Sequence, residues 1–487
     1  MSNAIRSLSP ADVWQCFADL NAVPRPSKKE EKVISFMMDF GHNLGLEVSK
    51  DEVGNVIIKK PATSGMENRQ TVVMQAHLDM VHQKNADTVF DFETQGIEMY
   101  IQDGWVRARG TTLGADNGLG VAAIMAVLKS KDLPHPAIEA LFTIDEETGM
   151  TGAKGLKEGV LSGQILLNLD TEDDDEIDIG CAGGIDVTAI REYREEEVPE
   201  SSMAYAITVK GLQGGHSGMD IHKGLGNANK IMNRLFFEGF EQFGLRISAI
   251  NGGSLRNAIP RESFAVVTVD TLQHDAFAFE FNQLAATIKR ELREVEPDLV
   301  ITAEVTDLPE TVMELGVQEG FTRALYCAHN GVYAMSKSIP GLVETSNNIA
   351  RVKVKNGTIR IGCLTRSSVE SAKIDLANTL RSAFELAGFE VSLDGDYPGW
   401  NPNVNSPILK VLEQKYEELF HEKPRVVACH AGLECGILGQ NYPDMDMISF
   451  GPTIKGAHSP DERAAIASVE KFWKFVQEIL KEIPLKY

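Results

Sequence analysis

The chain has 487 residues, with 47 Lys and Arg against 70 Asp and Glu, so its formal net charge is −23. This acidic balance argues against nucleic acid and against an anionic membrane surface as partners, because both attract basic proteins. Hydrophobic residues make up 43% of the chain, which is enough for a sizeable core, and the length suggests two or three domains.

The sequence also predicts a cytoplasmic protein. No apolar run approaches the roughly 18 residues of a membrane helix. The N-terminus lacks a basic segment followed by an apolar stretch, so no signal peptide is expected. Six scattered cysteines without a CxxC pair are typical of free thiols in a reducing compartment.

Seven segments in the first third of the chain have helical or extended patterns. Helices are predicted at residues 9–20, 28–44 and 118–130, and strands at residues 55–60, 71–76, 140–144 and 164–169. Strands that alternate with helices favour an α/β domain with a mixed, largely parallel sheet flanked by helices.

The pattern changes after a glycine-rich turn at residues 180–184. Up to about residue 390, strands and helices alternate with few polar clusters, which predicts an inserted α+β domain. The α/β pattern then resumes. We therefore predict a discontinuous domain of residues 1–183 and 395–487 and an insertion of residues 184–394, and no internal repeat is strong enough to predict.

Three predicted strands of the first domain end in polar side chains. His77 and Asp79 follow one strand, Glu146 and Glu147 follow another, and Asp170 follows a third. Ligands of open α/β sheets bind at the carboxyl ends of the strands, so we expect these side chains to converge at one edge.

His, Asp and Glu side chains in such a position are ligands for Zn²⁺, with Mn²⁺ and Co²⁺ as substitutes. Two ions about 3.5 Å apart need a carboxylate shared between them. The candidate ligands are His77, Asp116, Glu147, Asp170 and His458. If the strand continues through Glu146 and Glu147, their side chains diverge, so one could bind metal while the other takes a proton from water.

Each of these residues also has an ordinary structural explanation. His77 alone is more often a structural histidine, Asp79 could bind backbone amides, and Asp116 could be the N-cap of the helix that follows. Taken alone, Glu146 and Glu147 are best explained as a solvated strand end. His458 alone is best explained as part of a turn. All of these explanations would have to hold independently, so together the residues favour a metal centre.

Five short motifs lie in order along the chain. They are HLDMV from His77, GADNG from Gly114, DEETG from Asp145, NLD from Asn168 and GAHSPDE from Gly456. Their order and spacing resemble the dinuclear zinc aminopeptidase and carboxypeptidase superfamily that includes the carnosinases. Longer blocks such as GTTLGADNG, GLQGGHSGMDIH, NGGSLRNAIPRE and HAGLECG span both predicted domains and resemble the bacterial aminoacyl-histidine (Xaa-His) dipeptidases.

The resemblance implies two zinc ions per subunit, bridged by Asp116. His77 and Asp170 would complete one metal site, and Glu147 and His458 would complete the other.

The resemblance also implies roles for residues that bind no metal. Asp79 would orient the imidazole of His77, and Glu146 would act as general base and then as general acid. In the insertion, His216 would stabilise the oxyanion, while Asn257 and Arg366 would hold the substrate, with Arg366 suited to a terminal carboxylate.

Without the resemblance, these three residues of the insertion have other interpretations. His216 reads as a loop histidine, or with His222 as a separate metal site. Asn257 and Arg366 read as ordinary turn and surface residues.

The function that the resemblance implies is hydrolysis of dipeptides, preferentially aminoacyl-histidine dipeptides including β-alanyl-histidine. It also implies that residues 1–183 and 395–487 form the catalytic domain and that the insertion is a lid domain through which a homodimer forms. His216 is a candidate to serve the neighbouring active site. A broader di- or tripeptidase and an N-acyl amino acid deacylase are alternatives, because they share the metal residues. A non-catalytic, metal-stabilised scaffold is disfavoured, because it would not need Glu146 beside five ligands.

Overall fold

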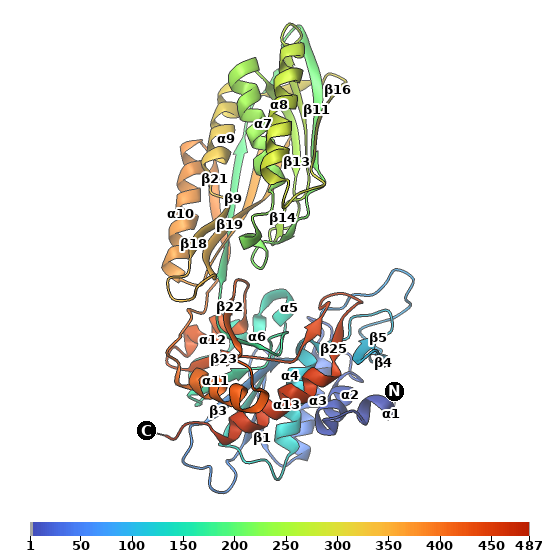
Figure 1. Cartoon of the computed structure of the whole chain (residues 1–487), viewed down its shortest axis with the longest axis vertical. Coiled ribbons are helices and arrows are strands. Elements are labelled where there is room, and N and C mark those ends of the chain that lie inside the picture. The colour runs from blue at the N-terminus through green and yellow to red at the C-terminus, as the bar shows by residue number, and fades with distance from the viewer. Residues whose placement is uncertain (1–2, 487) are drawn as a thin grey trace. The chain divides into compact units, whose positions relative to one another are not determined.

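The computed structural model describes residues 3–486 and divides the chain into two compact units (Figure 1). Unit 1 runs to Gly180 and includes Trp400–Ala428 and the chain from Leu433. Unit 2 holds Cys181–Gly399 and Cys429–Gly432. The catalytic and lid roles of these parts of the chain stay predictions. No helix within residues 3–486 is long and apolar enough to span a membrane.

Unit 1 is built on a mixed sheet, in which eight strands are found within residues 3–486. Their order is β1 (Glu47–Lys50), β2 (Val56–Lys60), β6 (Ile138–Thr143), β3 (Val72–His77), β7 (Ile165–Asn168), β23 (Asp446–Ser449), β8 (Glu176–Cys181) and β22 (Arg425–Cys429). Pairing is parallel from β6 through β3 and β7 to β23, and antiparallel from β1 to β6 and between β23 and β8. The predicted mixed sheet is confirmed, but its parallel part is limited to the central strands.

Every residue of β3, β6 and β7 is buried, which explains why these strands read as apolar runs without alternation. The helices of unit 1 are α1 (Asn3–Arg6), α2 (Ala11–Leu20), α3 (Glu31–Asn43), α4 (Ala115–Lys129), α5 (Glu146–Gly149), α6 (Thr151–Gly155), α11 (Pro407–Phe420), α12 (Glu434–Asn441) and α13 (Ile466–Lys481). Helix α4 packs against β3 and α2. Val73, Leu141 and Leu166 of the sheet share a core cluster with Leu438 of α12.

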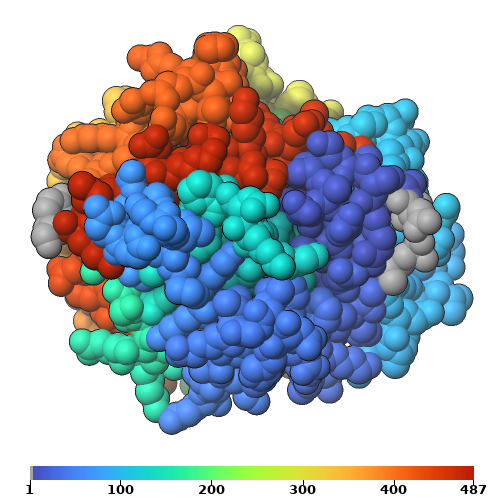
Figure 2. Space-filling view, turned by 90° about the horizontal axis from the view of Figure 1, so that it is seen from below, coloured from blue at the N-terminus to red at the C-terminus, as the bar shows by residue number. Residues whose placement is uncertain are grey.

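A small antiparallel sheet completes unit 1, with the order β24 (Ile454–Lys455), β25 (Arg463–Ala465), β5 (Trp105–Ala108) and β4 (Met99–Gln102). The last residues of the chain return to an early segment. Gln70 N–H donates to the carbonyl of Pro484 at 2.9 Å, and Lys486 N–H donates to the carbonyl of Asn68 at 2.8 Å. Blue early segments and the red end of the chain accordingly meet on the surface in Figure 2.

Unit 2 is built on an antiparallel sheet, in which nine strands are found in the described part of the chain. Their path is β16 (Val300–Thr306), β11 (Ser202–Lys210), β15 (Ser263–Asp270), β13 (Arg246–Gly252), β19 (Val343–Lys355), β20 (Thr358–Ser367), β9 (Gly183–Glu192) and β21 (Glu390–Tyr397), with β18 (Gly331–Met335) beside β19. The helices are α7 (Ala228–Phe243), α8 (His274–Leu292), α9 (Leu315–Cys327) and α10 (Glu370–Leu386), and a 3-10 turn η1 spans Ile221–Lys223. Two short pairs are β10 (Glu195–Glu197) with β17 (Thr311–Met313), and β12 (Gly215–His216) with β14 (Ala258–Ile259).

The order of these elements shows an internal repeat that the sequence pattern does not predict. One βαββαβ repeat is β11-α7-β13-β15-α8-β16, and it is inserted after β9 of a second repeat, β9-α9-β19-β20-α10-β21. Each repeat has its strands in the spatial order four, one, three, two. The repeats join through the pairing of β13 with β19. In this pairing Ile250, Asn251 and Gly252 lie opposite Val354, Lys353 and Val352. Because one repeat interrupts the other, no simple period appears along the chain.

Candidate metal centre

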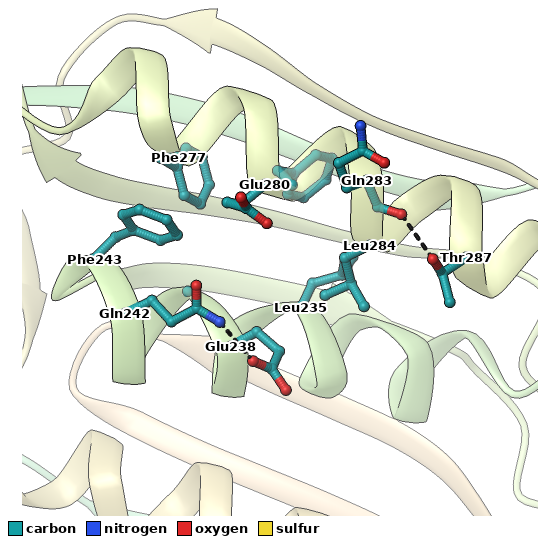
Figure 3. Close-up of a pocket in the computed structure, with 11 residues that line it drawn as sticks. Leu235, Glu238, Gln242, Phe243, Phe277, Glu280, Gln283, Leu284 and Thr287 are labelled. Atoms are coloured by element: carbon teal, nitrogen blue, oxygen red, sulfur yellow. Dashed lines mark hydrogen bonds between the residues drawn. The ribbon is translucent and has the colours of Figure 1, made fainter.

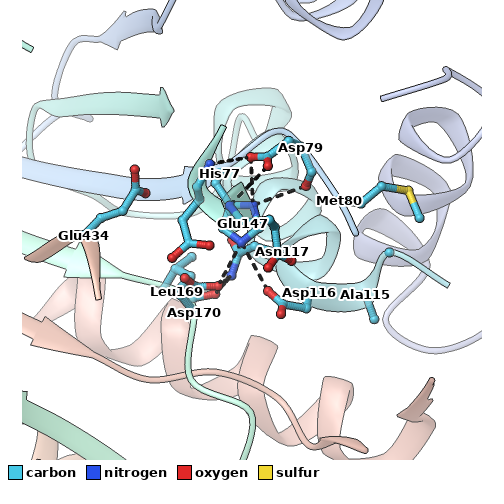
Figure 4. Close-up of polar contacts among 12 residues, drawn as sticks. His77, Asp79, Met80, Ala115, Asp116, Asn117, Glu147, Leu169, Asp170 and Glu434 are labelled. Carbon is cyan, nitrogen blue, oxygen red and sulfur yellow. Dashed lines mark hydrogen bonds and ion pairs between the residues drawn. The ribbon is translucent and has the colours of Figure 1, made fainter. Parts of the chain in front are cut away.

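Most predicted site residues of unit 1 gather at one edge of its sheet, and Figure 4 shows His77, Asp79, Asp116, Glu147 and Asp170 there. His77 is the last residue of β3, Asp170 lies two residues beyond β7, and Glu146 begins α5, three residues beyond β6. These three strands are neighbours and run parallel, so their carboxyl ends meet. The expected convergence is therefore confirmed for these residues.

The first candidate group of metal ligands is His77, Asp116 and Asp170, whose ligand atoms all lie within 4.8 Å of one another. Nε2 of His77 is 3.1 Å from Oδ1 of Asp116 and 3.5 Å from Oδ1 of Asp170. Nδ1 of the same ring lies 3.2 Å from the carbonyl oxygen of Asp79. That contact leaves Nε2 to face the two carboxylates.

The second candidate group is Asp116, Glu147 and His458. Nε2 of His458 is 3.3 Å from Oδ2 of Asp116 and 3.0 Å from Oε2 of Glu147. Asp116 therefore turns one carboxylate oxygen to each group. A shared carboxylate is what two neighbouring metal ions require.

The charges of these groups favour cations. Burial opposes a charged His77, but the carboxylates of Asp170, Asp116 and Asp79 hold its pKa well above the usual value. Burial also raises the pKa of Glu147, and that of Asp170 to about 6. Hydrogen bonds to Asp116 and Glu147 raise the pKa of His458 to about 11. Imidazole and carboxylate groups both hold protons more strongly here than in water, because the site lacks positive charge. Bound cations would supply that charge.

A further sign is a carboxylate oxygen without a partner. Oε1 of Glu147 is buried, and no hydrogen-bond partner for it is found among the described residues. Buried polar atoms of this kind call for an explanation such as an ion. Together with the nitrogen and oxygen donors of both groups, it shows that the residues present fit a pair of divalent cations such as Zn²⁺.

The carboxylate of Asp79 is fully buried and holds the surroundings of His77 in place. Its Oδ1 lies 3.3 Å from Nδ1 of His77 and accepts the backbone N–H of Glu146 at 3.0 Å, while its Oδ2 accepts the backbone N–H of Glu147 at 3.3 Å. It also accepts the Ser27 hydroxyl at 2.8 Å. The structure thus places Asp79 where it can orient the ring, and the backbone-binding alternative also holds.

Glu146 lies beside these residues, with its carboxylate in a group with His77 and Glu147. Burial raises the pKa of Glu146 well above its usual value. The strand does not continue through the acidic pair, because it ends at Thr143 and α5 begins at Glu146 after Asp145 adopts φ 52°. The two side chains still diverge, since neighbours on a helix lie about 100° apart.

Asp116 lies at the start of α4 but does not cap the helix. Gly114 occupies the cap position with φ 70°, and Asp116 itself has the extended angles φ −81° and ψ 112°. The alternative role of Asp116 as an N-cap is therefore wrong. The peptide bond between Asp116 and Asn117 is cis.

Three further residues support the site and were not predicted. Asn117 donates to the Leu169 carbonyl at 2.7 Å and to the carboxylate of Asp170. Arg25 and Glu462 are buried and bind the backbone of the turn before Asp116. Asn117 and Glu462 lie inside the motifs GADNG and GAHSPDE, but a side chain that binds backbone leaves no pattern of its own.

His216, Asn257 and Arg366 belong to unit 2. Nδ1 of His216 accepts the N–H groups of Gly218 and Met219 at 3.2 and 3.1 Å, which leaves Nε2 as the ring's hydrogen-bond donor. Burial and the nearby Arg366 lower the pKa of His216 to about 4, so the ring is neutral. Within residues 3–486, no candidate metal group includes His216 or His222.

Arg366 is only 4% exposed, so the reading of it as a surface residue is wrong. It donates to the Tyr397 hydroxyl at 2.7 Å and to the Ser217 hydroxyl at 3.4 Å. None of the ion pairs among residues 3–486 includes it. Asn257 is exposed, and its carbonyl accepts the N–H of Ser217 at 2.8 Å, so Ser217 touches both predicted substrate-binding residues.

Comparison with known proteins places the chain in a family. The cytosol non-specific dipeptidase of Escherichia coli (strain K12) is 44% identical over 482 residues, which cover 99% of each chain. The solved aminoacylhistidine dipeptidase of Vibrio alginolyticus has a TM-score of 0.93 and 45% identity, again over 99% of each chain. Aminopeptidase PepT of Bacillus cereus, with a TM-score of 0.58 and 17% identity over 98% of this chain and 99% of its own, shares the fold.

Residues 73–482 match Peptidase family M20/M25/M40. These matches confirm the predicted resemblance to metal-dependent dipeptidases and the mixed α/β fold. The chain belongs to peptidase family M20/M25/M40.

Proposed function

We propose that this chain is a dipeptidase that uses two bound metal ions to hydrolyse dipeptides, preferentially those that end in histidine. The observation that carries the proposal is the position of Asp116, which shares its two carboxylate oxygens between two groups of ligands. The carboxylate of Glu146, which we assign to no metal, lies beside them. The names of the two relatives covered almost end to end support dipeptides as substrates, and one of them names aminoacyl-histidine.

The metals we propose are two Zn²⁺ per subunit, with Co²⁺ or Mn²⁺ as substitutes. His77 and Asp170 would hold one ion, Glu147 and His458 would hold the other, and Asp116 would hold both. Such ions, when bound, acidify a water molecule and polarise the carbonyl group that is attacked.

Glu146 is the proposed general base and general acid. Its carboxylate takes the proton of the attacking water and returns it to the nitrogen of the leaving amine. Burial raises the pKa of this carboxyl, while bound cations would lower it. Asp79 keeps Glu146 in place by binding its backbone N–H and keeps His77 in place through Nδ1.

In unit 2, we propose that Arg366 binds the terminal carboxylate of the substrate. A buried guanidinium without a carboxylate partner in the described chain suits an anionic ligand. His216, neutral and with a donor at Nε2, would stabilise the oxyanion and bind substrate. Asn257 would contribute a further polar contact to the substrate.

We also propose a homodimer formed through unit 2, and a cytoplasmic location like that in the name of the E. coli relative. Support for the dimer comes from a groove of about 330 Å³ between α7 and α8, lined in part by Leu235, Phe243 and Phe277 (Figure 3). Phe279 of α8 is 62% exposed. Sedimentation velocity tests the proposed dimer. A Phe279→Asp variant should shift the equilibrium from dimer toward monomer.

A broader di- or tripeptidase is the second candidate, favoured by the word "non-specific" in the name of the E. coli relative. An N-acyl amino acid deacylase is the third. Steady-state rates on β-alanyl-histidine, alanyl-leucine, a tripeptide and an N-acetyl amino acid separate the three. The proposal predicts the highest kcat/KM on an Xaa-His dipeptide. A higher value on the N-acetyl amino acid would contradict it.

A further inference from the structure

We propose that Glu462 is a positioning residue for the metal centre, which acts with Arg25 to hold the turn that carries Asp116. This inference rests on the proposed function, because it concerns how the proposed metal ligands are kept in place. Neither residue is itself among the candidate ligands. Both act on backbone groups of residues 113–116.

The first observation is that one buried carboxylate binds four successive backbone N–H groups. Oε2 of Glu462 accepts from Leu113 at 2.7 Å and Gly114 at 2.9 Å, and Oε1 accepts from Ala115 at 2.7 Å and Asp116 at 3.3 Å. Glu462 is 2% exposed. Four amides can face one acceptor because Gly114 has φ 70°, a left-handed conformation that forms a concave nest of N–H groups.

The second observation is that Arg25 binds the same turn through its carbonyl side. Nη2 of Arg25 donates to the carbonyl of Gly114 at 2.5 Å. Nη1 donates to the carbonyls of Leu78 at 3.0 Å and Asp79 at 3.1 Å. Arg25 is 1% exposed, and none of the ion pairs within residues 3–486 includes it. The guanidinium therefore ties the turn of Asp116 to the segment that follows His77.

The packing around Arg25 leaves no room for side chains at two nearby glycines. A Cβ atom on Gly114 would lie 2.6 Å from Nη2 of Arg25 and 2.9 Å from Sδ of Met80. A Cβ atom on Gly118 would lie 2.6 Å from the same Nη2. Both glycines of the GADNG motif are thus required by the packing of the arginine, and Gly114 also by its positive φ.

The third observation is that Glu462 belongs to the loop that carries His458, between β24 and β25. The N–H of Glu462 donates to the carbonyl of Ser459 at 3.0 Å, and the Ser459 hydroxyl donates to the carbonyl of Gly456 at 2.7 Å. One side chain thus joins the backbones that carry Asp116 and His458. Loss of this carboxylate should loosen the group of Asp116, Glu147 and His458, while β3 still anchors His77.

The test measures metal binding, with activity as a second readout. In a Glu462→Gln variant, an amide N–H₂ group faces backbone N–H donors and the charge is lost. We expect the ion that Glu147 and His458 would hold to bind about 10- to 100-fold more weakly. This is the usual effect of losing a residue that supports a metal ligand. Competition against a chelator gives the two dissociation constants, and the visible spectrum of the Co²⁺-loaded enzyme should change.

A matched control is Glu139→Gln. Glu139 is 3% exposed and accepts the backbone N–H groups of Ser162 at 2.8 Å and Gly163 at 3.0 Å, near the other end of β6. This variant should lower the melting temperature and leave both metal affinities and the Co²⁺ spectrum unchanged. If Glu462→Gln does not fold, Arg25→Lys replaces it, because lysine keeps the charge but has one nitrogen in place of the two, Nη1 and Nη2, that reach the separate carbonyls.

The outcomes separate this inference from the proposed function. If the wild-type chain binds two ions and hydrolyses dipeptides, an unchanged pair of affinities and an unchanged Co²⁺ spectrum in Glu462→Gln overturn the inference alone. The same holds for Arg25→Lys where it is the variant tested. If the wild-type chain binds no metal, the proposed function and this inference both fall.

Discussion

The carboxylate of Asp79 accepts the backbone N–H of Glu146 at 3.0 Å and lies 3.3 Å from Nδ1 of His77. One buried side chain thus fixes both a proposed metal ligand and the proposed base. Neither contact depends on an exposed group, because Asp79 and His77 are buried. The proposed chemistry therefore depends on Asp79, although we assign it to neither metal ion.

An Asp79→Asn variant should lower both metal affinity and turnover. The two carboxylate oxygens of Asp79 face the backbone N–H groups of Glu146 and Glu147, Nδ1 of His77 and the Ser27 hydroxyl. Asparagine has only one oxygen acceptor, so it cannot replace all of these contacts. The expected loss is about 10- to 100-fold, as for other residues that orient metal-bound histidines. Zinc content after dialysis and kcat measure it. Wild-type values for both would show that Asp79 does not orient the site.

A Glu146→Gln variant should keep both metal ions and lose most turnover. Glutamine has nearly the same shape but cannot take a proton, so kcat should fall by about 10²- to 10⁴-fold. Elemental analysis checks that the metal content is unchanged, and dipeptide hydrolysis gives kcat. Substantial remaining activity would show that another group is the base.

An Arg366→Met variant should raise KM for dipeptides by about 10- to 100-fold, because it removes a charged hydrogen bond to the substrate carboxylate. The matched substrate is the dipeptide amide, which lacks that carboxylate and should be affected little. Arg256→Met is a matched variant, since Arg256 of unit 2 pairs with Asp186 at 3.1 Å. An equal rise in KM for dipeptide and amide would argue against the assignment.

Buried His430 should make the fold less stable in acid. Burial, followed by the charge of Arg366, lowers its pKa to about 3, and its Nε2 lies 2.8 Å from the Ser346 hydroxyl. The unfolded chain takes up this proton below about pH 6.5, while the folded chain does so only near pH 3, so stability falls as the pH drops between these values.

At pH 5 this effect corresponds to about 2 kcal/mol of unfolding free energy for one histidine. Urea denaturation at pH 7 and pH 5 measures it in wild type and in His430→Gln. The wild-type chain should lose about 2 kcal/mol more than the variant between the two pH values. An equal loss in both would mean that His430 is not the group responsible.

Much of the site could be predicted because its side chains follow apolar strands. His77 and Asp170 lie at the ends of β3 and β7, where the parallel pairing brings them together. Arg25 and Glu462 could not be predicted in this way. They bind carbonyl and N–H groups, and any stretch of sequence offers those groups.

The fold, like the site, could be predicted only in part. The buried strands and α4 were visible as apolar runs, whereas the start of α5 at Glu146 depends on the left-handed conformation of Asp145. The two βαββαβ repeats of unit 2 were hidden because β11–β16 interrupt the second repeat after β9. Their relation appears only in the order of strands in the sheet.

Titration of the metal-free chain with Zn²⁺ tests the central claim most directly. Hydrolysis of β-alanyl-histidine and bound zinc are followed together, with Asp116→Ala as the control that lacks the shared carboxylate. The account predicts that activity rises to its maximum at two zinc ions per chain and that the Asp116→Ala variant binds zinc weakly and stays inactive. Full activity without metal, or tight binding of two ions by Asp116→Ala, would contradict it.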